Sequence, residues 1–186
     1  MRVVHKPRLE HIKKIINTAP ELEHAIFETR KTRPRDMSID KAPTSVEIDH
    51  TKLKNYIDFL STNPKFKVNQ ISITHNHPQN GHPETIRLGF RDVVSFESIF
   101  SKLGINTFKI IDSRHGEIIG ETILDFKNYK TKLTNATYIK LEQLSKEKSL
   151  GYWYHYLKLR GVKLKFIPNK KAGYILDEKN VKFIKK

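Results

Sequence analysis

The octapeptide Ile71-Ser72-Ile73-Thr74-His75-Asn76-His77-Pro78 combines a strand pattern with two closely spaced histidines. Apolar, β-branched residues at its start predict a buried strand that includes residues 68–74, and Pro78 predicts where this strand ends. Side chains two residues apart in a strand point to the same side, so His75 and His77 should project together. Two imidazoles held in this way can bind one metal ion.

Charge and composition narrow the classes of protein to which this chain can belong. Its 186 residues suit one domain with a small appendage, and its formal net charge is +15. Such an excess of Lys and Arg favours an anionic partner: nucleic acid, an acidic protein or a membrane surface. The chain contains no cysteine, which excludes disulfides, thiolate zinc sites and cysteine nucleophiles.

Membrane insertion and secretion are not expected. No apolar run approaches the ~20 residues that a bilayer span needs. The N-terminal residues also lack the apolar core of a signal peptide. We therefore expect a cytoplasmic protein that has no membrane partner.

Apolar periodicity predicts the elements before the octapeptide. Helical spacing indicates helices over residues 9–18 and 52–60, and residues 23–29 and 45–49 are typical of strands. The charged stretch 30–43, which contains two prolines, indicates a loop.

After the octapeptide, a long loop is expected over residues 79–92, followed by a helix that Ser95 caps and Gly104 ends. A hairpin should follow, formed by residues 107–112 and 117–122. We then expect a helical stretch over residues 135–159 and three short strands at residues 162–167, 173–176 and 181–184. This order predicts an α+β or α/β domain with a mixed sheet flanked by helices. We divide it into a core, residues 1–130, and a basic C-terminal extension, residues 131–186, packed on that core.

The order of strand, His-x-His-Pro, loop and serine-containing helix start resembles the JAB/MPN (JAMM) metalloprotease family. The likeness covers about residues 21–125. The string His75-Asn76-His77-Pro78 is similar to the branch that includes RadC-type proteins and the C-terminal domains of phage minor head proteins. The resemblance implies a cytidine-deaminase-like α+β core, a zinc-dependent peptidase or isopeptidase activity, and a viral or mobile-element origin. A protein substrate or a virion component would then be the partner, with a virion-associated location.

The resemblance also implies roles for individual residues. Glu23 falls on the general base of the family, His75 and His77 on zinc ligands, and Ser95 on the serine that stabilises the oxyanion. The aspartate of the family's Ser-x-x-Asp pattern falls on Ser98, whose hydroxyl is a poor zinc ligand.

Three nearby side chains are candidates to replace that aspartate: Asp92 at the end of the long loop, Glu97 beside the expected position, and His82 within the loop. A third protein ligand is the minimum for catalytic zinc. A histidine pair that has lost its metal, in a catalytically degenerate relative, stays open as the alternative.

A second hypothesis is nucleic-acid binding or a virion-associated role without catalysis. Five rings stand together at residues 152–156, and the most basic part of the chain follows them. Exposed aromatic and basic side chains together suit base stacking and phosphate contact. The candidate contacts are Lys158, Arg160, Lys163, Lys165, Lys170 and Lys171. A third hypothesis is a metal-dependent nuclease that uses the same histidine pair.

Overall fold

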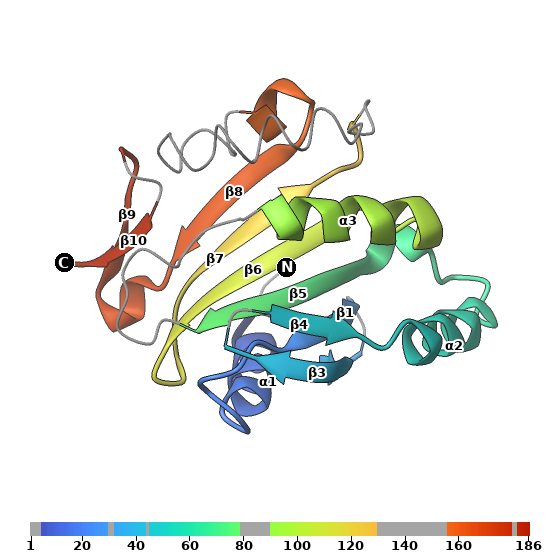
Figure 1. Ribbon diagram of the computed structural model, residues 1–186, viewed down its shortest axis with the longest axis horizontal. Helices are drawn as coiled ribbons and strands as arrows, with labels where there is room; N and C mark the ends of the chain where they lie inside the picture. The colour runs from blue at the N-terminus through green and yellow to red at the C-terminus, as the bar shows by residue number, and fades with distance from the viewer. Residues whose placement is uncertain (1–4, 30–31, 44, 79–89, 130–155, 180–181) are drawn as a thin grey trace.

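The computed structural model describes residues 5–29, 32–43, 45–78, 90–129, 156–179 and 182–186 (Figure 1). A six-stranded sheet forms the centre, in the order β2-β1-β5-β6-β7-β8. Its strands are β1 (Ala25–Thr29), β2 (Arg35–Asp36), β5 (Ile71–Pro78), β6 (Thr107–Arg114), β7 (Glu117–Asp125) and β8 (Lys163–Pro168). Strands β5 and β6 are parallel and the other neighbours antiparallel, so the sheet is mixed.

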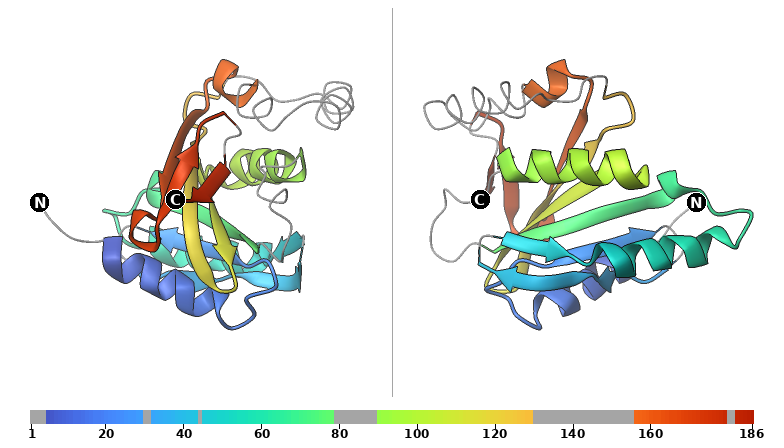
Figure 2. Two further views of the ribbon diagram at one scale, coloured as in Figure 1. Left: turned by 90° about the vertical axis from the view of Figure 1, so that its left-hand side faces the viewer. Right: turned by 45° about the vertical axis from the view of Figure 1, so that its right-hand side comes forward.

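Helices cover both faces of this sheet (Figure 2). Helix α1 (His5–Ile16) lies on one face, and α2 (His50–Ser61) and α3 (Phe90–Leu103) lie on the other. The larger core is on the α2–α3 side, where Phe96 of α3 stacks on Phe108 of β6 with ring centroids 4.4 Å apart. The fold class is therefore α+β, as the sequence predicts.

Two small antiparallel ribbons complete the part of the fold that the structure describes. Strands β3 (Ser38–Ala42) and β4 (Ser45–Ile48) form one, and β9 (Tyr174–Asp177) and β10 (Lys182–Lys185) form the other. Short 3-10 turns, η1 (Val68–Gln70) and η2 (Lys170–Ala172), precede β5 and β9. The strand β8 comes from the predicted C-terminal extension, yet it pairs along β7 as an edge strand of the central sheet.

Several sequence predictions are confirmed. The helices at residues 9–18 and 52–60 correspond to α1 and α2, and the last three strands to β8, β9 and β10. The predicted hairpin is β6–β7, whose turn places His115 and Gly116 at φ values of 47° and 74°. Two consecutive positive φ angles are what a two-residue hairpin loop of type I′ requires. Gly104 directly follows α3 with φ 68°, as expected for a C-cap.

Other predictions are wrong. The stretch 30–43 is not a loop throughout, because it contains β2 and β3. Residues 68–70 form a 3-10 turn, so β5 begins at Ile71 and includes both histidines and Pro78. Helix α3 begins at Phe90, so Ser95 is not its cap and Asp92 lies in its first turn, not in a loop.

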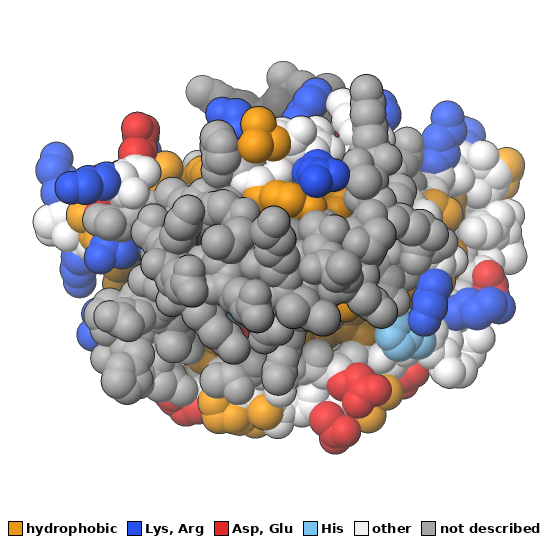
Figure 3. Space-filling model, turned by 45° about the horizontal axis from the view of Figure 1, so that its top comes forward, with side chains coloured by type: hydrophobic (Ala, Val, Ile, Leu, Met, Phe, Trp, Pro, Cys, Tyr) orange, Lys and Arg blue, Asp and Glu red, His pale blue; other side chains and the backbone are white. Residues whose placement is uncertain are grey.

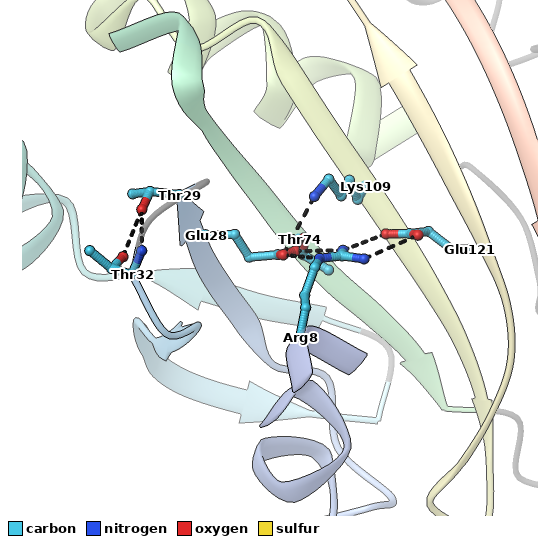
Figure 4. Close-up of polar contacts among 7 residues, drawn as sticks. All are labelled: Arg8, Glu28, Thr29, Thr32, Thr74, Lys109 and Glu121. Atoms are coloured by element: carbon cyan, nitrogen blue, oxygen red, sulfur yellow. Dashed lines mark hydrogen bonds and ion pairs between the residues drawn. The ribbon is translucent and has the colours of Figure 1, made fainter. Parts of the chain in front are cut away.

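A largely buried charge cluster joins α1 to the face of the sheet that this helix covers (Figure 4). The guanidinium of Arg8 donates hydrogen bonds to Glu28 of β1 and to Glu121 of β7, and the Lys109 ammonium lies 3.4 Å from the Glu28 carboxylate. Burial raises the pKa of Glu28, but hydrogen bonds from Arg8 and Thr74 and the charges of Arg8 and Lys109 outweigh burial and lower it. The cluster therefore fixes α1 by ionic contacts as well as by apolar packing.

Among the described helices, none is both long and apolar enough to cross a membrane.

Candidate metal centre

The two histidines of β5 meet as the strand pleat predicts. His75 and His77 are each 7% exposed, and their Nε2 atoms lie 2.7 Å apart. They share the α3 side of the sheet, where the His75 ring packs 5.6 Å from that of Phe96. The apolar face of α3 therefore closes one side of the histidine pair.

Asp92, from the first turn of α3, supplies a third candidate ligand. Its carboxylate oxygens lie 3.4 Å from His75 Nε2 and 3.9 Å from His77 Nε2. One ligand atom from each of the three residues lies within 4.8 Å of the others. An acidic residue in the first turn also suits the partial positive charge of a helix N-terminus.

This arrangement fits a transition metal. Ligand atoms about 2.0–2.1 Å from a tetrahedral zinc ion stand about 3.3 Å from one another, and the measured separations of 2.7, 3.4 and 3.9 Å bracket that value. Two imidazoles and one carboxylate also form the donor set of a catalytic zinc site, which keeps a fourth position open.

Both imidazoles are held in the form that binds metal. Burial lowers the pKa of His75 despite the nearby negative charge of Asp92. Burial, followed by the neighbouring His75, lowers the pKa of His77 to about 4. Neutral rings at pH 7 keep a lone pair for coordination without having to lose a proton first.

Glu23 lies just before β1 and lines the same cavity as His75 and Asp92. Strand β1 pairs Ala25 with His75, which brings the residues preceding Ala25 to this end of β5. The cavity has a volume of about 390 Å³, and Ser95 and the β4 residue Glu47 also line it. Burial, together with the negative charge of Asp92, raises the pKa of Glu23 to about 8. A buried carboxyl that titrates near neutral pH is typical of a proton-transfer group.

Asn76, between the two histidines, holds the Glu23 segment in place. Its side-chain oxygen accepts the backbone N–H of His24 at 2.7 Å, and its amide nitrogen donates to the Leu22 carbonyl at 3.1 Å. Both contacts flank Glu23, whose own N–H donates to Ala42 at 2.9 Å. Sequence reasoning missed this role and read Asn76 only as the spacer between two ligands. The available signal was a polar side chain on the strand face opposite the histidines.

His24 is a structural residue. Its buried ring lies between Asp36 of β2, with Nδ1 3.0 Å from the carboxylate, and the Ala19 carbonyl, 3.1 Å from Nε2. Although burial opposes it, hydrogen bonds from His24, Lys41 and Ser38 hold the pKa of Asp36 well below its usual range.

The remaining predicted site residues lie in different places. Ser95 lines the cavity as an exposed residue in the second turn of α3. Glu97 accepts a hydrogen bond from the Tyr129 hydroxyl. Ser98 belongs to α3, and His82 lies outside the described residues. The carboxylate that reaches the histidines is thus Asp92, six residues before the position that the resemblance indicated.

That shift also changes the expected serine. Counting three residues back from Asp92 along the Ser-x-x-Asp pattern gives Gly89, which has no hydroxyl. Position 89 lies outside the described residues, whereas Ser95 of α3 and Ser45 of β4 both line the cavity.

The basic candidates lie in the C-terminal part of the chain. Five of them are exposed: Lys158, Lys163, Lys165, Lys170 and Lys171. Arg160 is half-buried, and its guanidinium carbon lies 5.1 Å from the centre of the Tyr156 ring. Of the aromatic run at 152–156, only Tyr156 is described, and it is buried. Figure 3 shows Lys and Arg side chains at the left, along the top and at the right of one face of the molecule.

No model of a known protein family matches this sequence. No curated protein matches it significantly either.

Proposed function

We propose that this chain is a metal-dependent hydrolase of peptide or isopeptide bonds, with a JAB/MPN-like site on a cytidine-deaminase-like core. The observation that carries this proposal is the convergence of His75, His77 and Asp92 within 4.8 Å beside the cavity that Glu23 lines. These three residues would hold zinc, and Glu23 would move the proton.

A bound zinc ion would supply Lewis acidity, which would polarise a carbonyl and lower the pKa of a water molecule to about 7. Glu23 accepts a proton from the attacking water and delivers it to the leaving amine nitrogen, so the products are a carboxylic acid and an amine. Of the two serines that line the cavity, Ser45 and Ser95, we assign Ser95, which is on the same helix as Asp92, as the donor to the developing oxyanion. The α3 face that carries Phe96 limits access of bulk water to the histidines.

The test separates metal binding from chemistry. Glu23→Gln should retain the metal of the wild type and lose hydrolysis of a peptide or isopeptide library, because it removes only the proton acceptor. His77→Ala should lose both. Hydrolysis that survives Glu23→Gln would remove Glu23 from the mechanism.

Nucleic-acid binding is the second candidate, and one observation favours it. Lys163 and Lys165 are both exposed and lie two residues apart on the edge strand β8, so they share one face, and exposed Lys170 and Lys171 follow. If the protein binds nucleic acid, its affinity for DNA or RNA should fall steeply as the salt concentration rises. The double substitution Lys163→Glu with Lys165→Glu should weaken that affinity. A flat salt response removes the candidate, whereas metal-dependent cleavage of plasmid that survives Glu23→Gln would favour a nuclease.

A further inference from the structure

The ring of His77 has one nitrogen that the candidate metal centre does not use. Its Nε2 faces His75 and Asp92, at 2.7 and 3.9 Å. Its Nδ1 is buried and has no hydrogen-bond partner among the described residues. Histidines that bind metals almost always donate this second N–H to a carboxylate, a carbonyl or water. His77 thus lacks the partner that a metal ligand normally has.

A buried carboxylate stands next to His77 on the neighbouring strand. The parallel pairing of β5 and β6 places Asp112 directly beside His77. Asp112 is two and four residues from Ile110 and Phe108, whose side chains belong to the core on the α3 side, so its side chain shares the face of the two histidines. It is 1% exposed, and its Oδ1 has no hydrogen-bond partner among the described residues. Unpaired buried carboxylates are rare in native proteins.

The strand on the other side of Asp112 offers no donor side chain. Asp112 is paired there with Gly120 of β7. A Cβ atom at Gly120 would lie 2.3 Å from ring carbons of Phe183, so an apolar ring occupies the space over this glycine. Of the two residues paired across the sheet with Asp112, only His77 has a side chain able to donate a hydrogen bond to it.

We propose that Asp112 is a positioning residue for the metal centre: its carboxylate accepts a hydrogen bond from His77 Nδ1–H when the site is loaded. This inference rests on the proposed function. The bond fixes the tautomer that leaves the Nε2 lone pair free for the metal, and it fixes the orientation of the ring. The Nε2 atoms of the two histidines are 2.7 Å apart, against about 3.3 Å for two ligands of a tetrahedral zinc ion, and the hydrogen bond to Asp112 would hold the His77 ring at the wider separation.

The test measures zinc affinity by competition with a chelating dye, and zinc stoichiometry by elemental analysis. We expect Asp112→Asn to keep the stoichiometry of the wild type but to bind zinc about 10–100-fold more weakly. Asp125→Asn is the matched control, because it makes the same change at the far end of the β6–β7 pairing and should leave affinity unchanged. Affinity of Asp112→Asn within twofold of the wild type would overturn the proposal.

A spectroscopic measurement separates positioning from a general structural role. In zinc-loaded wild type labelled with ¹⁵N-histidine, His77 should show a protected Nδ1–H proton in NMR spectra. Asp112→Ala should shift that signal or expose it to exchange, while the signals of His24 stay in place. An unchanged His77 signal in the variant would contradict the proposal. Wild type that binds no zinc would instead refute the proposed function, which keeps the two failures distinct.

Discussion

Glu23 illustrates at the scale of one residue how a candidate site can oppose stability. Its pKa of about 8 means that the folded, metal-free protein prefers the neutral acid, whereas the unfolded chain ionises near 4.5. Between these two values the folded state binds more protons than the unfolded state. Unfolding free energy therefore falls as pH rises through this window. A cation at the site would favour the ionised form of Glu23 and so reduce this loss of unfolding free energy.

Replacing Glu23 by Gln should remove this pH dependence. In metal-free protein, Glu23→Gln should match the wild type near pH 4.5 and exceed its stability at pH 8 by roughly a few kcal/mol. Urea unfolding of both proteins across this pH range gives their unfolding free energies as a function of pH. Subtracting one curve from the other removes the contributions of the other titrating groups, which the two proteins share. Parallel curves would show that Glu23 is not held as a buried acid.

Asn76 provides a second prediction at this scale. Asn76→Ala removes both side-chain hydrogen bonds that hold the segment around Glu23, at an expected cost of about 1–3 kcal/mol in unfolding free energy. Hydrolysis should fall strongly, while zinc stoichiometry stays that of the wild type, because the ligands are untouched. Asn128→Ala, at an exposed position, is the control. Full hydrolytic activity in Asn76→Ala would show that this segment needs no such clamp.

Sequence reasoning could place the histidines but not their third partner. The common direction of His75 and His77 follows from the strand pleat alone. Asp92 is separated from them by residues 79–89, and no local pattern specifies how a segment of that length returns the chain. The apolar spacing of Val93, Phe96 and Ile99 did contain a clue, because it extends the helix before Ser95 and puts Asp92 in its first turn.

At the scale of elements, the β9–β10 ribbon is attached to the sheet through a glycine. Phe183 of β10 packs with Ile119 and Tyr174, and its ring lies where a side chain at Gly120 would be. The close approach explains why β7 has no side chain at this position.

Gly120→Ala should therefore displace Phe183 and destabilise the protein by about 1–3 kcal/mol. The double variant Gly120→Ala with Phe183→Leu should lose less unfolding free energy than the two single variants together, because the smaller leucine leaves room for the new methyl group. Thermal or urea unfolding of the four proteins gives this coupling. Additive effects would mean that the two positions do not compete for the same volume.

Helix α1 depends on the ion pairs of its half-buried residue Arg8. Arg8→Met should cost about 3–5 kcal/mol, because it leaves Glu28 and Glu121 buried without their shared cation. Adding Glu121→Gln should recover part of the loss, and Lys14→Met, at an exposed position of the same helix, should have little effect. If the Arg8→Met protein were as stable as the wild type, apolar packing alone would be what holds α1 on the sheet.

Elements with strong periodicity were predictable, and the short surface strands were not. The largely buried apolar runs of β6 and β7 and the apolar face of α2 were visible in the sequence. Strands β2 and β3 are short and charged and contain no buried residue, so burial leaves no period in their sequence. Cross-strand pairing and the contacts of Asp36 with His24 and Lys41 hold them instead.

At the scale of the whole molecule, the two proposed activities use different regions. The candidate metal centre lies between β5 and α3, while the exposed lysines of β8 and η2 lie in the C-terminal part of the chain. The net charge of +15 favours approach of an anionic partner over the whole surface. Hydrolysis and nucleic-acid binding can therefore be tested by separate substitutions without one affecting the other.

Metal content tests the central claim most directly. Protein exposed to zinc and then freed of excess ion should retain about one zinc ion per chain by mass spectrometry, in the wild type and in Glu23→Gln alike. His75→Ala with His77→Ala should retain almost none while staying folded. A wild type that retains no more metal than this double variant would contradict the account.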